Sequence, residues 1–568
     1  MNDPGHSPGS DRFGIAEGYF GVDGIWHDTP AETRRLLQEV IGEPRPGPPL
    51  WFVEHGTHPR LWSHCHLTLD SGRDLGVVDR IPEDTPLGYH DLRPVDGGPT
   101  TRLIVHPPTC PAPPVGWGLA VQLYSLCSAG TQGIGDLADL ATLARWLQAA
   151  GGSVVLLSPL HAPSPGGHQQ DSPYYPSTRR WRNPLHLRVE GLEPWRHALI
   201  ERDDVWARKR DALWSRFRSR SAEQDASFRS WSAAQGESLG QWVRWAAGAE
   251  RRQQRETREF HGWLQWLFDE QLAAVRAEAP EDRLIGDLAI GFDPDGADAE
   301  LFAGVIARGW RIGAPPDAFN ANGQDWGLPP LIPWRLRAAC YEPFIQTLRG
   351  ALRGLGGLRI DHVMGLFRQY WIPPGRGAAD GAYVRFPAEE LLAIVALEAT
   401  RAGAFVVGED LGTVEDTVRP ALARFGILRT TVAWFEGEPP EEYPRQSLAT
   451  LTTHDLPTAT GLWRGMDGDA QLRRTLSELI GAPPATSAGE VVVRAYQALG
   501  AAPSALKLAT LEDLCLSELR PNVPGTTLER PNWRLPLPLT VEELTRSPIP
   551  ARVALALGES SARRGSAR

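Results

Sequence analysis

The segment from Trp117 onward alternates short apolar runs with longer amphipathic stretches, and this alternation limits the possible folds more than any other feature. Residues 118–126, 136–152 and 153–160, for example, are typical of a strand, a helix and a second strand. Strands separated by helices predict a parallel sheet with right-handed crossovers. About eight such runs in roughly 440 residues predict an α/β fold, a (β/α)8 TIM barrel with large helical insertions. The runs are residues 118–126, 153–160, 283–291, 356–363, 404–412, 429–435, 448–455 and 505–513.

Changes in composition predict where the parts of the chain begin and end. Residues 1–14 are expected to be disordered. Residues 551–568 are expected to form a C-terminal tail, of which the last part, residues 560–568, is expected to be frayed. One helix pattern and several strand-like runs indicate a small β-rich N-terminal module over residues 15–115. The barrel then covers residues 116–550, with a helical insertion of two or three helices at about 195–280 and a loop subdomain at about 313–345. The strand-like runs of the module are residues 50–56, 64–70, 88–92 and 101–107.

Charge and cysteine content exclude several classes of function. The net charge of -11 argues against a general nucleic-acid or anionic-membrane binder. The five cysteines are far apart and form no CxxC pair, so we expect free thiols in a reducing compartment and no zinc site. The N-terminus lacks the apolar run of a signal peptide, and no stretch approaches 18 apolar residues. We therefore expect a cytoplasmic protein without a membrane span.

Acidic residues stand at the ends of four predicted strands: Asp287, Asp361, Glu409 and Asp455. Any one of them could simply cap the following helix. Four carboxyl groups at four strand ends fit helix caps poorly. In a parallel barrel the carboxyl ends of the strands gather at one face, where catalytic groups lie. The pattern therefore predicts a catalytic cluster of carboxylates.

Two of these carboxyl groups have surroundings that predict opposite pKa shifts. Arg359 lies on the same face of its strand as Asp361, and a nearby cation lowers the pKa of a carboxyl group. Glu409 follows an apolar strand, where burial is expected to raise its pKa so that it can act as a general acid. A nucleophilic carboxylate beside a carboxylic acid is the arrangement used in glycosidic bond chemistry. His454, next to Asp455, is suited to bind sugar hydroxyls.

Several motifs resemble one enzyme family over essentially the whole predicted barrel. GLRIDHVMG, VVGEDLGTV and TTHDLPT resemble strand motifs of the α-amylase clan. GAPPDAFNANGQDWGLPPL, at residues 313–331, is similar to a block of the amylomaltases, the 4-α-glucanotransferases of glycoside hydrolase family 77. Residues 120–140, 171–185 and 522–534 support the same resemblance, and the N-terminal segment resembles the longer bacterial members.

The resemblance implies a role for each matching residue. Asp361 would be the nucleophile, Glu409 the general acid/base, and Asp455 the third carboxylate, which distorts the sugar. The residues that would bind the sugar are Arg359, His454, Asp287, Tyr174, Trp326 and Asn522.

Some of these assignments have structural alternatives. Trp326 could anchor a loop instead of contacting sugar, and Tyr174 could brace its turn. His362 and Asp410 alternate away from their catalytic neighbours, so we expect His362 to be structural and assign Asp410 no catalytic role. The chain also departs from the commonest family pattern at Leu456-Pro457 and after Tyr174, which leaves the acceptor side open.

The implied activity is cleavage of α-1,4 bonds in maltodextrins and transfer of the glucanosyl unit through a covalent glucosyl-enzyme. Net retention is expected, with the carboxyl carbons of Asp361 and Glu409 about 5–5.5 Å apart. The expected partners are a maltooligosaccharide donor and a glucan or glucose acceptor, without metal or cofactor, in a monomer or small homo-oligomer. The alternatives are an α-glucan hydrolase, which would use water as acceptor, and a silent glucan-binding protein, against which the complete carboxylate set argues.

Overall fold

The computed structural model describes residues 9–21, 24–278, 284–316, 322–468, 470–481, 483, 485–526 and 529–565. The chain forms two compact units. The first unit comprises Met1–Ala112, Ile290–Arg353 and Ile360–Leu428. The second unit comprises Pro113–Ala289, Gly354–Arg359 and Arg429–Arg568. Along the described residues, no helix has both the length and the apolar character that crossing a membrane requires.

Eight strands close into a barrel in the order β12-β15-β18-β19-β20-β21-β8-β9, so that each strand lies beside the next one in the chain. Each strand lies within or overlaps one of the eight predicted apolar runs, and the predicted (β/α)8 barrel is confirmed. The pairs β8–β9, β9–β12, β19–β20, β20–β21 and β21–β8 are parallel. The strands are β8 (Gly116–Val121), β9 (Val154–Leu157), β12 (Leu284–Leu288), β15 (Gly357–Ile360), β18 (Phe405–Gly408), β19 (Leu428–Val432), β20 (Ser447–Thr450) and β21 (Leu506–Thr510).

The barrel strands are buried on both faces. Every residue of β12, β15, β18, β20 and β21 is buried. This burial explains why the strands appear in the sequence as nearly continuous apolar runs instead of alternating ones. The helices that accompany the strands include α2 (Leu137–Ala149), α10 (Val418–Arg424), α11 (Ala459–Arg464), α12 (Ala470–Ile480), α13 (Ala488–Gly500), α14 (Leu511–Leu514) and α15 (Val541–Arg546).

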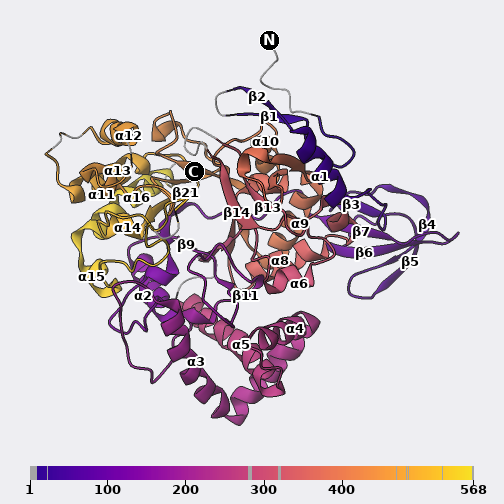
Figure 1. Cartoon of the computed structure of the whole chain (residues 1–568), viewed down its shortest axis with the longest axis horizontal. Coiled ribbons are helices and arrows are strands. Elements are labelled where there is room, and N and C mark those ends of the chain that lie inside the picture. The colour runs from indigo at the N-terminus through magenta and orange to yellow at the C-terminus, as the bar shows by residue number, and fades with distance from the viewer. Residues whose placement is uncertain are drawn as a thin grey trace. The chain divides into compact units, whose positions relative to one another are not determined.

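The predicted helical insertion in the second unit contains three helices. They are α3 (Arg202–Arg218), α4 (Ala222–Ala249) and α5 (Arg255–Glu278), and Figure 1 shows them grouped together. Helix α4 begins with a capping box, in which Ser221 accepts the backbone N–H of Gln224 and the Gln224 side chain accepts the Ser221 N–H. It is kinked at Gly236, which has a φ of 57° and a ψ of -142°.

Residues 551–565 of the expected C-terminal tail are helical. Helix α16 spans Pro548–Gly565, and Val553 and Leu557 on it are completely buried. The polar end of this segment is typical of a tail, whereas the apolar residues before it are buried on the helix. At the other end of the chain, residues 1–8 of the predicted disordered segment lie outside the described residues, and Ser10 forms a β-bridge with Ala16.

The N-terminal module contains a five-stranded sheet in the order β3-β7-β6-β4-β5. The sequence predicts four of its strands, β3 (Leu50–Glu54), β4 (Arg60–Thr68), β6 (Gly88–Pro94) and β7 (Thr101–His106). It misses β5 (Asp74–Arg80), an edge strand with little burial, and the hairpin of β1 (Gly18–Phe20) and β2 (Trp26–Asp28). Helix α1 (Ala31–Ile41) follows the hairpin.

Part of the predicted loop subdomain belongs to a second sheet in the first unit. Strands β13 (Arg311–Ala314) and β14 (Gln324–Leu328) join β16 (Arg368–Ile372) and β17 (Ala382–Arg385) in the order β14-β13-β16-β17. Residues 317–321 of the family-like block lie outside the described residues. Helices α6 (Ala297–Leu301) and α7 (Pro333–Ala338) flank the two strands in sequence.

A buried carboxylate ties the N-terminal sheet to two barrel helices of the same unit. Glu398, on α9 (Ala388–Ala402), accepts a 2.7 Å hydrogen bond from the Tyr89 hydroxyl of β6. It also accepts two 3.0 Å hydrogen bonds from Arg349, on α8 (Glu342–Leu352). Burial and the neighbouring Glu398 raise the pKa of Tyr89, so its hydroxyl stays a donor. The sheet is therefore held against α8 and α9 by a charged hydrogen-bond network.

We predict that Tyr89→Phe lowers the free energy of unfolding by about 1–3 kcal/mol, because it removes one of the two donors to an oxygen of the buried Glu398 carboxylate. Urea unfolding followed by circular dichroism measures this change. Arg12→Gln, which breaks an exposed ion pair with Glu43, is the control and should have no measurable effect. Equal stability of Tyr89→Phe and the wild type would show that the network does not stabilise the fold.

Candidate active site

Two of the predicted catalytic carboxyl groups directly follow neighbouring strands in the first unit. Asp361 comes after β15, and Glu409 comes after β18. The Glu409 carboxylate accepts hydrogen bonds from the backbone N–H of His362, at 2.7 Å, and of Leu411, at 2.9 Å. The backbone N–H of Glu409 donates to the Ile360 carbonyl at 3.0 Å. Glu409 is thus bonded to the residues on either side of Asp361, and the sequence prediction that these two side chains belong to one site has a geometric basis.

The ring of His362 is buried and is expected to be neutral at neutral pH. Burial, assisted by the charge of Arg368, lowers the pKa of His362 to about 4. The residue has a φ of 45°, in the left-handed region, which turns the chain directly after Asp361. Its ring lies edge-on to Trp326, with centroids 5.2 Å apart. These contacts fit the structural role expected for His362.

Trp326, on β14, also donates its indole N–H to the Gln324 side chain at 3.1 Å. The ring is half-buried, so the contacts with Gln324 and His362 leave part of it accessible. Both sequence interpretations of Trp326, loop anchor and sugar contact, are compatible with this arrangement.

Asp410 is paired with an arginine of the same unit. Its side chain is buried and accepts a 3.0 Å hydrogen bond from Arg419.

In the second unit, Asp287, Arg359 and Tyr174 form one hydrogen-bonded group. Arg359 Nη1 lies 2.7 and 2.8 Å from the two oxygens of Asp287. The Tyr174 hydroxyl donates to the same carboxylate at 2.6 Å. The sequence predicts Arg359 as a neighbour of Asp361 and as a sugar-binding residue, and it does not predict this ion pair. An ion pair between two buried strand residues avoids the cost of an isolated buried charge.

Asp455 belongs to a second group in the same unit. Its Oδ1 accepts the Asn522 amide at 2.7 Å, and its Oδ2 lies 3.5 Å from Nε2 of His454. The backbone N–H of Asn522 donates to the His454 carbonyl at 3.0 Å. The prediction that Asp455 ends a strand is wrong, because β20 ends at Thr450 and Asp455 lies in the following loop. The loop after β21 holds it there through Asn522.

Aromatic rings connect the two groups of the second unit. The rings of Tyr174 and His454 stack with centroids 5.0 Å apart and an interplanar angle of 26°. Trp533 contacts both, at 5.4 Å from Tyr174 and 5.2 Å from His454. The sequence analysis did not single out Trp533, although it lies in the segment 522–534 that carries part of the family resemblance.

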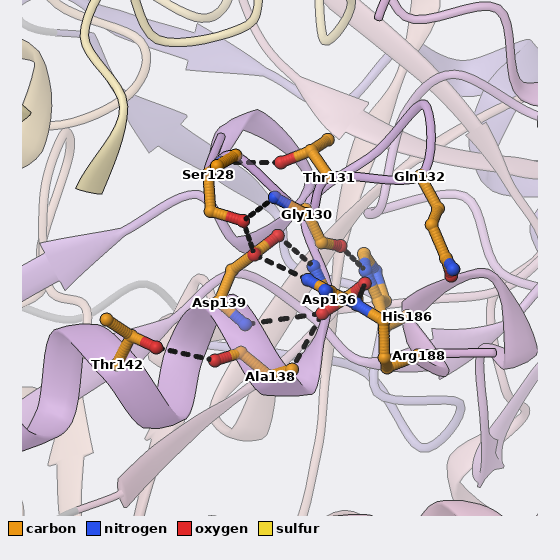
Figure 2. A network of polar contacts seen from close by, with 12 residues as sticks. Ser128, Gly130, Thr131, Gln132, Asp136, Ala138, Asp139, Thr142, His186 and Arg188 are labelled. Carbon is orange, nitrogen blue, oxygen red and sulfur yellow. Dashed lines mark hydrogen bonds and ion pairs between the residues drawn. The ribbon is translucent and has the colours of Figure 1, made fainter. Parts of the chain in front are cut away.

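Buried charges also fix the loop between β8 and α2. Asp136 caps α2 by accepting the backbone N–H groups of Ala138 and Asp139, and Arg188 binds Asp136 at 2.5 Å and Asp139 at 2.6 Å (Figure 2). Burial and the neighbouring charge of Asp136 raise the pKa of Asp139 to about 6. Ser128 donates to Asp139 at 2.5 Å. This network holds a loop at the carboxyl end of a barrel strand, where loops build the active sites of such barrels.

The closed barrel and the carboxyl groups that follow its strands define the class of the protein: a (β/α)8-barrel enzyme of the kind that acts on glycosidic bonds. Residues 121–256 and 246–540 match the model of glycoside hydrolase family 77, described as 4-alpha-glucanotransferase. The chain belongs to this family, and it is therefore a 4-alpha-glucanotransferase.

Relatives and solved structures agree with this assignment. The chain is 38% identical to the 4-alpha-glucanotransferase of Mycobacterium tuberculosis, over 82% of this chain and 78% of the relative. It is 35% identical to that of Haemophilus influenzae, over 69% of this chain and 67% of the relative. The crystal structure of amylomaltase from Corynebacterium glutamicum is similar with a TM-score of 0.86 and 30% identity, covering 96% of this chain and 98% of the other. An amylomaltase from Streptococcus agalactiae, at 19% identity and a TM-score of 0.62, shares the fold.

We predict that His362→Asn leaves both limbs of the pH dependence of kcat/KM at their wild-type positions. The imidazole of His362 gains its proton only near pH 4, below the range in which the enzyme's acid and base would titrate. Asn tolerates the left-handed backbone conformation at this position. The measurement is kcat/KM against pH for both proteins, and a displaced limb would assign His362 a role in proton transfer.

Proposed function

We propose that this protein cleaves α-1,4-glucosidic bonds of maltodextrins and transfers the glucanosyl unit to a glucan or glucose, with Asp361 as nucleophile, Glu409 as general acid/base and Asp455 as the third carboxylate. The single observation that carries the proposal is the hydrogen bond from the His362 N–H to the Glu409 carboxylate, which links the acid/base to the residue next to the nucleophile.

In the first step, an Asp361 oxygen attacks the anomeric carbon and Glu409 gives its proton to the glycosidic oxygen. The C–O bond breaks, the reducing-end fragment leaves, and a glucosyl ester with Asp361 remains. In the second step, the Glu409 carboxylate takes a proton from the acceptor hydroxyl, whose oxygen attacks the same carbon and releases Asp361. Each step inverts the anomeric centre, so the product retains the α configuration.

The surroundings of Glu409 support this double role. Two backbone N–H donors favour the ionised carboxylate, whereas the burial of the side chain favours the neutral acid. These influences oppose each other, which suits a group that acts first as an acid and then as a base. The rise in pKa that the sequence analysis expects for Glu409 stays a prediction, and so does the separation of about 5–5.5 Å between the two carboxyl carbons.

Transfer instead of hydrolysis requires that an acceptor sugar competes with water for the glucosyl ester. Water is present at about 55 M, and a hydroxyl held in attack geometry can reach effective molarities of about 10⁵ M or more. The stacked rings of Tyr174 and His454 offer apolar faces for pyranose rings, and Asp455 and Asp287 beside them offer acceptors for sugar hydroxyls. We assign Tyr174, His454, Asp287, Arg359 and Asn522 to substrate binding on this basis. We assign Trp326 to substrate binding because part of its ring is accessible.

We also propose a cytoplasmic location. All five cysteines are free, and four of them are buried, as expected for a protein of a reducing compartment. Detection of the tagged protein after cell fractionation tests this assignment.

Maltotriose distinguishes a transferase from a hydrolase. We predict that the protein converts maltotriose into glucose and a ladder of longer maltooligosaccharides, separated by anion-exchange chromatography. Shorter products alone would identify an α-glucan hydrolase, and unchanged maltotriose would identify a protein that only binds glucans.

We predict that Asp361→Asn lowers kcat by about 10³-fold or more, because no nucleophile remains to form the ester. Asp416→Asn, an exposed position in the loop that follows Glu409, is the control and should keep wild-type activity. Thermal unfolding verifies that both variants are folded. Wild-type turnover by Asp361→Asn would reject this residue as the nucleophile.

Glu409→Gln should lose activity on maltotriose but still release about one equivalent of fluoride per enzyme from an α-maltosyl fluoride. Fluoride leaves without a proton, so the first step survives, whereas the second step still lacks its base. Asp361→Asn should cleave neither donor. If Glu409→Gln released no fluoride from this donor, Glu409 would not be assigned as the general acid.

A further inference from the structure

Trp533 has a backbone conformation that non-glycine residues rarely adopt. Its φ is 63°, in the left-handed region, and its side chain is almost completely buried. Such a conformation costs free energy and persists only where the surroundings hold it. Two hydrogen bonds hold the backbone of Trp533. Its N–H donates to the Pro521 carbonyl at 2.9 Å, and its carbonyl accepts from the Arg202 side chain at 2.7 Å.

The Trp533 ring lies against both aromatic residues proposed to bind sugar. It contacts Tyr174 and His454, which stack on each other. Because little of its surface is exposed, Trp533 supports these rings and offers no face of its own to a ligand. Its position therefore sets where the two rings lie.

Arg202 is the first residue of α3 and is buried. Besides the Trp533 carbonyl, it binds Asp171 Oδ1 at 3.2 Å, and its guanidinium lies 5.0 Å from the centre of the Tyr124 ring. These three partners lie in the loops that follow β21, β9 and β8, respectively. A single guanidinium thus connects three loops at the carboxyl ends of barrel strands.

Neighbouring residues strengthen the same junction. The backbone N–H of Ile200 donates to the Arg534 carbonyl at 2.8 Å, and the Arg534 side chain forms an ion pair with Glu201. The start of α3 is therefore bonded to Trp533 and to the residue that follows it. The guanidinium suits this position because its planar, forked donors can bind a carboxylate and a carbonyl at once, which a lysine ammonium on a flexible stem does less well.

We propose that Arg202 is a positioning residue of the transferase: it holds the strained Trp533 so that the Trp533 ring fixes Tyr174 and His454 for a glucosyl unit. This inference rests on the proposed function of these two residues. It gives the helical insertion a role in the reaction, because the insertion supplies the guanidinium that orders the loops. Small displacements of binding groups reduce rates strongly, so loss of Arg202 should affect catalysis beyond its effect on stability.

The test compares Arg202→Met and Arg202→Lys with Arg210→Met. Arg210 lies on the same helix and forms a half-buried ion pair with Glu250, at 3.0 and 3.1 Å, within the insertion. Arg210→Met thus controls for the general loss of a buried charge pair in α3. With maltotriose as substrate, we expect Arg202→Met to lower kcat/KM by about tenfold to a hundredfold, with both a higher KM and a lower kcat. Arg202→Lys should be intermediate, and Arg210→Met should match the wild type in kcat/KM at a similar loss of thermal stability.

A double-mutant cycle tests whether Arg202 acts through Trp533. If it does, Trp533→Leu should add little to the effect of Arg202→Met on kcat/KM. If Arg202→Met does not fold, Arg202→Lys takes its place in the cycle. Additive effects, or wild-type kcat/KM in a folded Arg202 variant, would overturn the proposal.

Binding of maltotriose in the Asp361→Asn background separates this proposal from the proposed function. Calorimetry should show weaker maltotriose binding when Arg202→Met is added and unchanged binding when Arg210→Met is added. A wild-type protein that does not convert maltotriose, together with this loss of binding, would reject the proposed function and retain the role of Arg202. If the wild type converts maltotriose normally and the Arg202 variant binds it as well as its parent does, the role of Arg202 would be rejected and the proposed function retained.

Discussion

A charge on a strand that is buried on both faces must find a partner inside the protein, and this constraint arranges the polar groups of the barrel. Asp287 and Arg359, within or at buried strands, satisfy it by pairing with each other, and Tyr174 completes the group. Asp361 and Glu409 stand one residue past their strands, where backbone N–H groups become available to bind a carboxylate. Strand interiors thus hold paired charges, and the two carboxylates proposed for catalysis follow strand ends.

The additions to the barrel are attached by the same kind of interaction. The N-terminal sheet meets α8 and α9 of its unit through the buried Glu398, which receives donors from Tyr89 and Arg349. In the second unit, the helical insertion contributes Arg202, whose contacts all lie in loops that follow barrel strands. The two additions contact different elements. The sheet is bonded to helices, whereas the insertion is bonded to the loops beside Tyr174 and His454.

Prediction from the sequence succeeded where a local pattern carries the information. All eight barrel strands are recognisable because burial on both faces makes each one an apolar run. Edge strand β5 was missed because it is mostly exposed and has no such run. Asp455 was misplaced because the residues after Thr450, where β20 ends, directly continue its buried stretch. Helix α16 was overlooked because its end resembles a disordered tail.

The sequence by itself determined the barrel, the order of its strands and the acidic residues that follow them, because periodicity and strand ends are properties of neighbouring residues. Only the tertiary structure decided which groups meet. Arg202 and Trp533 are 331 residues apart in the chain, and Tyr89 and Glu398 are 309 apart. No local pattern encodes such a partnership, since it arises only when the barrel closes and its loops and additions pack. The partner of Arg359 and the support behind Tyr174 and His454 were decided in the same way.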